Sequence, residues 1–167
     1  MDLKEVKLQR VDFRGADLSG FNLTSVNLEG AHLSDANLSG ATLQGTNLSK
    51  AHLQRVNLSG VKLEKTRLYE ANLSDANLSG ANLQRVDLHK ANLSRANLQG
   101  ADLKGAFFRD ANLAGAQLQG AILSEGHLVN DYSGEQLKEV TITEIQIKSA
   151  IIDENTVLPQ HIDRSLL

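Results

Sequence analysis

Every fifth residue of this chain from Leu3 to Leu128 is Leu or Phe, and the register never slips. The twenty-six positions hold Phe only at Phe13 and Phe108. A period of five matches neither a strand, whose side chains alternate between two faces, nor a helix with 3.6 residues per turn. All of these side chains lie on one side of the backbone only if the chain turns a corner in every unit. The pattern therefore predicts a solenoid with the Leu column inside.

A second period of twenty residues gives the number of corners in each coil. Glycine recurs at this interval, together with the Asn three positions and the Ser one position before it. The residues are Gly20, Gly40, Gly60, Gly80, Gly100 and Gly120, with Asn37, Asn57, Asn77 and Asn97, and Ser19, Ser39, Ser59 and Ser79. Four units of five residues then make one four-sided coil, and residues one coil apart should stack at the sheet spacing of about 4.8 Å.

Charged residues at the last position of the unit follow the same twenty-residue period and alternate in sign. One set is Asp35, Arg55, Asp75 and Arg95, and the other is Lys50, Glu70, Lys90 and Asp110. Opposite charges stacked on neighbouring coils should form exposed ladders, as cross-strand pairs do. Each exposed pair is worth about 0–1 kcal/mol.

The repeated unit reads Ala or Val, Asn or Asp, Leu, and then two variable polar residues, as in Ala16-Asp17-Leu18-Ser19-Gly20. Over residues 1–130 the chain resembles the pentapeptide-repeat proteins, whose motif is A(D/N)LXX. The resemblance implies an all-β solenoid, a right-handed quadrilateral β-helix of about six and a half coils. It also implies that the central Leu and the small residue that begins the unit point inward. The core residues would include Leu18, Leu38, Leu58, Leu78, Leu98 and Phe108.

Larger residues at the second inward position should widen the coil locally; these are Phe21, Val26, Val56, Val61 and Val86.

The pattern stops after Leu128, so we divide the chain into a β-helix over 1–130 and a C-terminal cap and tail over 131–167. Two capping-box signals, Ser133–Gln136 and Thr143–Gln146, predict short helices over about 134–140 and 144–150. The N-terminal end has no comparable cap, and a free edge there could pair with another molecule. We therefore expect a monomer or a weak homodimer through a coil end.

Composition excludes several kinds of site. The chain has no Cys, which rules out disulfides and thiolate metal sites. His32 and His52 should stack one coil apart, but two imidazoles fall short of the three or four ligands that a metal site needs. A filled rod offers no concave pocket for catalysis. We expect no enzyme activity, no catalytic residues, no metal and no cofactor.

The sequence bears on membrane association but leaves the compartment open. No apolar run approaches transmembrane length, and residues 1–30 lack the apolar core of a signal peptide. We expect no membrane partner, and we take the cytoplasm as the default because the residues do not decide the compartment. A mature form of a protein exported to the periplasm or thylakoid lumen is the alternative, because the family that the chain resembles includes exported members.

Charge argues against nucleic-acid mimicry and nucleic-acid binding. Some proteins of the family inhibit topoisomerases by presenting a strongly negative rod, which requires dense charge of one sign. Residues 1–130 hold fourteen Lys and Arg and thirteen Asp and Glu, a net charge of +1. No basic stripe with stacking aromatics is present either, so no nucleic-acid partner is expected. A DNA-mimic inhibitor of a type II topoisomerase is the alternative function.

Two sides of the rod stand out as candidate contact surfaces. The side with the recurring glycines carries one charge in its columns, Asp17, and should present a flat strip rich in hydrogen-bonding groups. The strip includes Ser39, Asn57, Ser59, Asn77, Ser79 and Asn97. The side with Lys50 and Lys90 should expose Tyr69, His89 and Phe107. We therefore interpret the chain as a non-enzymatic scaffold or protein–protein interaction module with an unknown protein partner.

Overall fold

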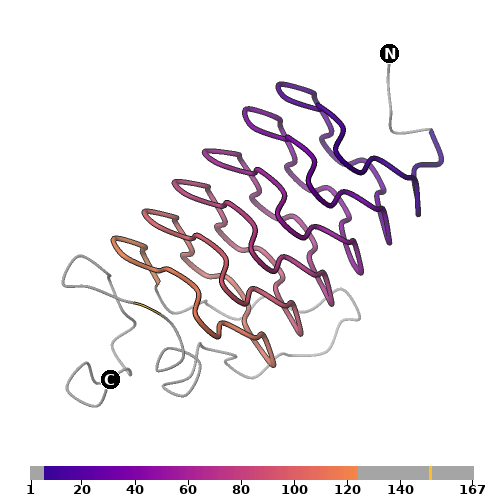
Figure 1. The fold of residues 1–167 in the computed structure, drawn as a ribbon. Coiled ribbons are helices and arrows are strands. Elements are labelled where there is room, and N and C mark those ends of the chain that lie inside the picture. Colours follow the sequence, from indigo (N-terminus) through magenta and orange to yellow (C-terminus); the bar gives the residue numbers. More distant parts are fainter. Residues whose placement is uncertain (1–5, 124–150, 152–167) are drawn as a thin grey trace, which may run out of the picture.

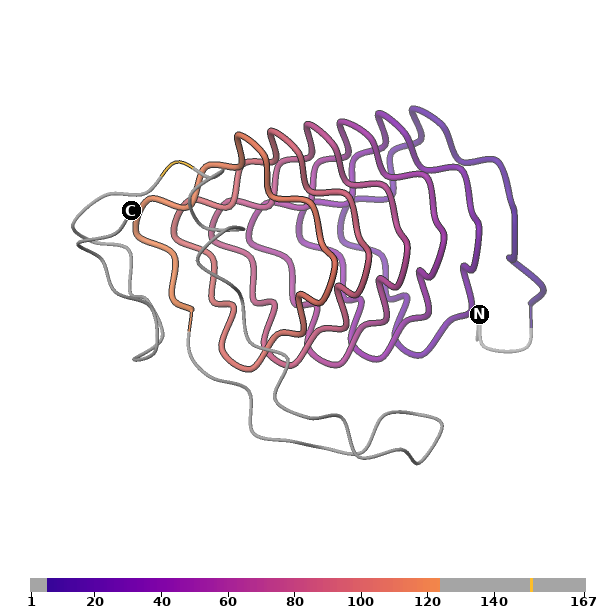
Figure 2. The same cartoon turned by 90° about the horizontal axis from the view of Figure 1, so that it is seen from below.

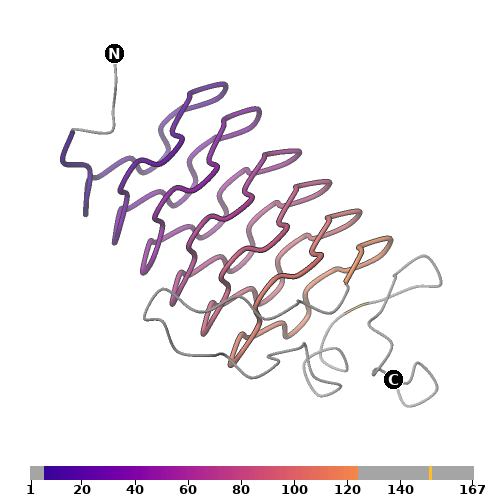
Figure 3. The ribbon, with the colours of Figure 1, turned by 180° about the vertical axis from the view of Figure 1, so that it is seen from behind.

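The computed structural model describes residues 6–123 and residue 151. Figure 1 shows these residues wound into successive coils that stack along one axis, with the chain advancing steadily from indigo to orange. The same stacking is visible from below and from behind (Figures 2 and 3). The described residues form no helix, and their strand pairing consists of isolated parallel bridges, with one bridging residue in each five-residue unit from residue 12 to residue 122.

A tight turn closes every unit. The carbonyl oxygen of the central Leu accepts a hydrogen bond from the amide three residues on, as from Ala41 to Leu38 at 3.0 Å and from Ala81 to Leu78 at 3.1 Å. The last residue of every unit from Arg10 to Gly120 has a positive φ, between 55° and 70°. A positive φ at only the third residue of the turn is the signature of type II geometry. At Gly60 an added Cβ would meet no atom within 4 Å, so conformation rather than space favours glycine there.

The bridges establish the twenty-residue coil. All bridges but one join residues twenty apart, as between Asn57 and Asn77. At the bridge of Asn57 with the preceding coil, its amide donates to Ala36 at 3.0 Å and its carbonyl accepts from Leu38 at 2.9 Å. Four turns for every twenty residues give the coil four sides, and the twenty-residue repeat predicted from the sequence is confirmed.

We name the four sides by the residues at their bridges. The histidine side has Asp12, His32, His52, Asn72, Asn92 and Asn112. The glycine side has Asp17, Asn37, Asn57, Asn77, Asn97 and Gln117. The glutamine side has Asn22, Thr42, Lys62, Asn82, Asp102 and Ile122. The aromatic side has Asn27, Asn47, Arg67, Asp87 and Phe107.

The core is a continuous column of Leu side chains with Ala or Val beside them. Leu38, Leu58, Leu78 and Leu98 are fully buried at 0% exposure, Phe108 is 2% exposed, and Leu18 in the first coil reaches 9%. Complete burial of one Leu side chain contributes about 1.5–3 kcal/mol. Because four sides converge on a narrow interior, the second inward position is mostly Ala.

Two threonines take that second inward position and bury a hydroxyl. Thr46 and Thr66 are 0% exposed. Their Oγ1 atoms donate to the carbonyl oxygens of Leu23 and Leu43, each at 2.7 Å. A buried hydroxyl is tolerated when it is hydrogen-bonded, and here each hydroxyl ties one coil to the coil before it.

Phe21 departs from the sequence prediction. The pattern places it among the inward residues that should widen the coil, but its side chain is 50% exposed. An aromatic ring exceeds the space that Ala or Val occupies in this position. Phe21 stands in the first described coil of its side, which begins with the bridge from Asn22 to Thr42. Its exposure shows that this side chain is not buried in the core, contrary to the prediction.

The last described coil receives a bridge from far along the sequence. Ile151 pairs with Gln117, where a twenty-residue step would place residue 137. The Leu118 amide donates to the Ile151 carbonyl and the Ile151 amide donates to the Ala116 carbonyl, both at 2.8 Å. Apart from Ile151, the segment 131–167 lies outside the described residues, and so do both predicted helices. Within the described part of the chain, no helix is long and apolar enough to cross a membrane.

Replacing a core Leu by a charged residue should abolish cooperative folding. Leu78→Asp would place an unpaired carboxylate in a fully buried site, which costs several kcal/mol. The neighbouring change Ser79→Asp alters a half-exposed residue and should shift stability by no more than about 0.5 kcal/mol. Chemical denaturation followed by circular dichroism measures both. Equal losses of stability would contradict the assignment of inside and outside.

The buried threonine hydroxyls should each contribute measurable stability. Thr66→Val keeps the side-chain shape but removes the bond to the Leu43 carbonyl, and should lower the free energy of unfolding by about 0.5–1.5 kcal/mol. Val86 occupies the same column one coil later and provides the matched reverse change, Val86→Thr. If Thr66→Val leaves the denaturation midpoint unchanged, the hydroxyl bond contributes nothing.

Candidate interaction surface

The glycine side carries a ladder of asparagine side chains. The Nδ2 of Asn57 donates to Oδ1 of Asn37 at 3.1 Å, and Asn77 donates to Asn57 at 3.3 Å. The ladder begins where Asn37 donates to Asp17 at 3.2 Å and continues to Asn97, which donates to Asn77 at 3.5 Å. The bridging backbone therefore holds these amides in one repeating orientation along the rod.

The Asn oxygens of this ladder are used within the protein. Oδ1 of Asn57 accepts from the Ser59 amide at 3.2 Å, from the Ser59 hydroxyl at 2.9 Å and from the next Asn of the ladder. Ser79 and Asn77 repeat both serine bonds. What remains for a partner is one amide hydrogen on each Asn and the oxygen lone pairs of each Ser. The strip therefore offers fewer free groups than its composition predicts.

The structure brings the six predicted surface residues onto one side. Ser39, Asn57, Ser59, Asn77, Ser79 and Asn97 are all half-buried, and the glycine corners beside them are exposed. From Asn37 to Gln117 this side carries no charged residue. The arrangement can recognise a partner by shape and hydrogen bonds, and it has no group that could carry out acid, base or nucleophilic chemistry.

The two histidines of the histidine side stack face to face. The ring centroids of His32 and His52 are 4.5 Å apart and the rings are tilted by only 3°. Nitrogen lone pairs on parallel rings point the same way and do not converge on one ion. In the described part of the chain, no group of three His, Asp or Glu side chains could hold a metal.

The charge ladder on the histidine side forms as pairs. Arg55 donates twice to Asp35 at 2.6 Å, and Arg95 donates twice to Asp75 at 2.7 Å. These hydrogen bonds from arginine lower the pKa of both carboxyl groups. Each guanidinium binds the Asp of the preceding coil, so the predicted ladder is confirmed as two separate pairs.

The second predicted ladder does not form. Among residues 6–123, no ion pair links Lys50, Glu70, Lys90 and Asp110. Tyr69 lies beside this column instead: its hydrogen bond with Glu70 raises the pKa of the phenol, and the Lys90 ammonium lies 5.9 Å from its ring centroid. Glu70 and Lys90 thus interact with the Tyr69 side chain rather than with each other.

The aromatic side is less open than the sequence predicts. Tyr69 and His89 lie with ring centroids 6.2 Å apart, and both are half-buried. Burial lowers the pKa of His89. Phe107, predicted to be exposed, is also half-buried, so that prediction was wrong. Its amide and carbonyl bridge to the coil before it, and the bridging position holds the ring close to the rod.

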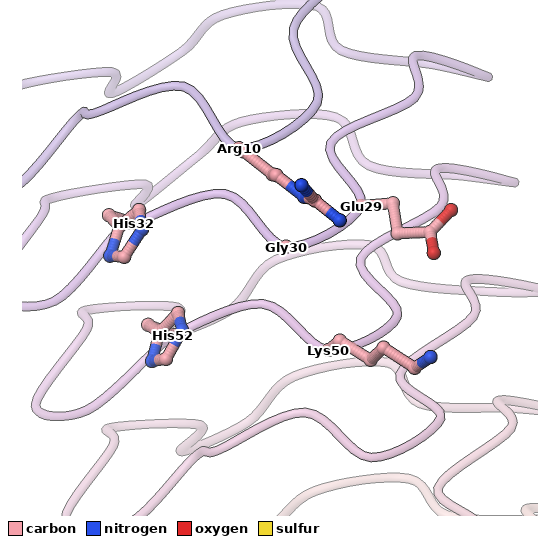
Figure 4. Close-up of a pocket in the computed structure, with 6 residues that line it drawn as sticks. All are labelled: Arg10, Glu29, Gly30, His32, Lys50 and His52. Atoms are coloured by element: carbon pink, nitrogen blue, oxygen red, sulfur yellow. The ribbon is translucent and has the colours of Figure 1, made fainter.

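The repeat pattern does not predict a groove on the surface of the rod. An open groove lies where the aromatic and histidine sides meet, around Gly30 (Figure 4). Sequence reasoning singled out His32, His52 and Lys50 but neither Arg10 nor Glu29. The only signal is that Gly30 interrupts the column between Arg10 and Lys50.

Five-residue sides, an inward Leu column and a left-handed corner residue define a four-sided pentapeptide solenoid. The chain matches the family model for a pentapeptide repeat region over residues 31–108 and the model for pentapeptide repeats (8 copies) over residues 91–128. It belongs to the pentapeptide-repeat family, which confirms the resemblance seen in the sequence. A search of curated proteins finds no match.

Several solved structures are similar to this chain. A pentapeptide repeat protein from the Arabidopsis thaliana thylakoid lumen is 28% identical over 74% of this chain and 86% of its own, with a TM-score of 0.38. Rfr23 from the cyanobacterium Cyanothece 51142 is 26% identical over 89% and 88%, with a TM-score of 0.33. QnrB1, a plasmid-mediated fluoroquinolone resistance protein, is 20% identical over 87% and 81%, with a TM-score of 0.32. Family membership rests on the two repeat models and not on these scores.

Acid should destabilise the rod through its paired aspartates. Arg14 lowers the pKa of Asp12 from 3.8 to about 2. The arginine partners of Asp35 and Asp75 lower the pKa of those two carboxyl groups as well. Because these folded-state pKa values lie below the unfolded value, the stabilisation is present above about pH 4 and is lost as pH falls towards about 2. We expect the melting temperature to fall across this window.

The variant Arg55→Gln/Arg95→Gln should show a shallower fall over the same window, because Asp35 and Asp75 lose the partners that lower their pKa. Lys62→Gln/Lys65→Gln removes the same charge from two exposed lysines and serves as the control. Thermal denaturation at a series of pH values measures the slopes. Identical slopes for the two variants would contradict a role for the ion pairs.

Proposed function

We propose that this protein is a non-enzymatic scaffold or protein-interaction module that binds a protein partner through the glycine side. The observation that carries the proposal is the uncharged Asn–Ser strip from Asn37 to Gln117, held in one orientation by its own ladder. Because the strip is already ordered, binding costs little side-chain entropy. The free Asn amide hydrogens favour a partner that presents oxygen acceptors at regular spacing, as an extended protein segment does.

Charge supports a protein partner over nucleic acid. A phosphate backbone is bound by several cations in a row. On the histidine side the arginines are bound to aspartates, and on the aromatic side Glu70 and Asp110 alternate with Lys50 and Lys90. Neither side presents a continuous run of one sign. The same alternation argues against a DNA mimic, which stays the alternative function.

The proposal includes the parts of the architecture beyond the described coils. We propose about six and a half coils closed by a helical cap over 131–167, in a chain that is monomeric or weakly dimeric through a coil end. The bridge between Ile151 and Gln117 supports a returning segment at the C-terminal end. We take the cytoplasm as the compartment, with an exported form as the alternative.

Charging the strip should abolish partner binding. The variant Ser39→Lys/Ser59→Lys/Ser79→Lys places three like charges along the glycine side without touching the core. The matched control is Ser34→Lys/Ser74→Lys/Ser94→Lys, which alters the same turn position on the histidine side. Affinity capture from an extract of the source organism, analysed by mass spectrometry, compares both with the native protein.

We expect one protein to be captured by the native chain and by the control variant but not by the strip variant. Loss in both variants would reject the glycine side as the docking surface. Capture of a topoisomerase, with inhibition in a gyrase supercoiling assay, would favour the DNA-mimic alternative instead.

A further inference from the structure

The groove at the meeting of the aromatic and histidine sides gathers positively charged and hydrogen-bonding groups. It has a volume of about 350 Å³ and is open to solvent. Its lining residues are Arg10, Glu29, Gly30, His32, Lys50 and His52. Figure 4 shows the two stacked histidines on one flank, with Arg10 and Lys50 on the other flank above and below Gly30.

Glycine at position 30 leaves room for the side chain of Arg10. Arg10, Gly30 and Lys50 are successive members of one column, so the two cationic residues stand two coils apart, roughly 10 Å by the sheet spacing. A Cβ added at Gly30 would lie 3.2 Å from Cγ of Arg10. The arginine side chain therefore already lies across the position that a side chain at residue 30 would occupy.

Neither cation is neutralised within the described coils. Arg55 and Arg95 bind aspartates of the neighbouring coil, but no such ion pair involves Arg10 or Lys50 among residues 6–123. Glu29 is the one carboxylate in the lining, and Figure 4 shows its side chain extending away from the histidines on the same side as Arg10 and Lys50. Two cations and one carboxylate leave the lining with a net positive charge, and no ion pair involves either cation within residues 6–123.

We propose that this groove binds a phosphate-type dianion. The planar guanidinium of Arg10 matches two phosphate oxygens with parallel N–H bonds, and Lys50 supplies a compact second charge. The imidazoles of His32 and His52 line the opposite flank, and Arg10 and Lys50 extend away from them (Figure 4), so the two cations supply the main contacts to the anion. The site is independent of the partner strip, since it lies on other sides of the rod.

The surroundings favour one small anion over a polymer. Beyond Lys50 the column continues with Glu70, Lys90 and Asp110, so acidic residues interrupt it at once. A nucleic-acid backbone would meet these carboxylates, whereas a single phosphate would contact only the groove around Gly30.

An NMR titration with inorganic phosphate, at constant ionic strength set by chloride, tests the site. We expect saturable shifts of the Gly30 amide and of the His32 and His52 ring signals. The exposed double variant Arg10→Gln/Lys50→Gln should weaken the affinity about tenfold or more. The control Lys65→Gln/Lys90→Gln removes two exposed lysines outside the groove and should change the affinity for phosphate by less than about twofold.

A second titration with phosphoserine distinguishes a free phosphate from a phosphoester as the ligand, and saturable binding of either supports the site. Chemical shifts that grow linearly with phosphate concentration would show that no specific site exists. An equal loss of affinity in the two double variants would show that only the overall charge matters. Either result would overturn the proposal. Because the native protein alone gives the first result, the test does not depend on how the variants fold.

Discussion

A left-handed residue at the end of each five-residue unit is the constraint on which the rest of the structure depends. Every such residue from Arg10 to Gly120 has a φ between 55° and 70°, and this conformation lets the chain turn and return the next Leu to the inside. Glycine adopts it freely, while residues such as Arg85 accept a steric cost of roughly 1–2 kcal/mol. The inter-coil hydrogen bonds and the buried Leu column offset that repeated cost.

The same corner determines what the outer sides can display. Each Asn or Asp at the bridging position accepts a bond from the amide two residues on, as Asn72 does from Ser74 at 3.1 Å, and so stabilises the corner that follows it. Stacking then places identical positions on adjacent coils. The Asn ladder, the His32–His52 stack and the Asp35–Arg55 pair are three results of one geometry with different side chains.

The sequence predicted the repeating part of this structure because periodicity reports backbone geometry directly. The Leu and Gly periods gave the coil length and the inward column, which the bridges and burial show. Features that break the repeat could not be predicted from its period. Phe21 is larger than the Ala or Val of the other units and is half exposed, and Ile151 reaches Gln117 across a segment without the motif. Lack of charge identified the candidate strip, but only side-chain geometry revealed that its oxygens are occupied.

The two proposed surfaces would respond to their partners by different physics. The glycine side is uncharged from Asn37 to Gln117, so long-range attraction contributes little and binding depends on shape and on the ordered amides. The groove beside Gly30 holds two cations that form no ion pair within residues 6–123, so its attraction for an anion falls as salt screens them. Because the coils hold both surfaces on different sides, a change in ionic strength can alter occupancy of the groove without altering the strip. The rod can thus keep a protein contact and an anion contact independent.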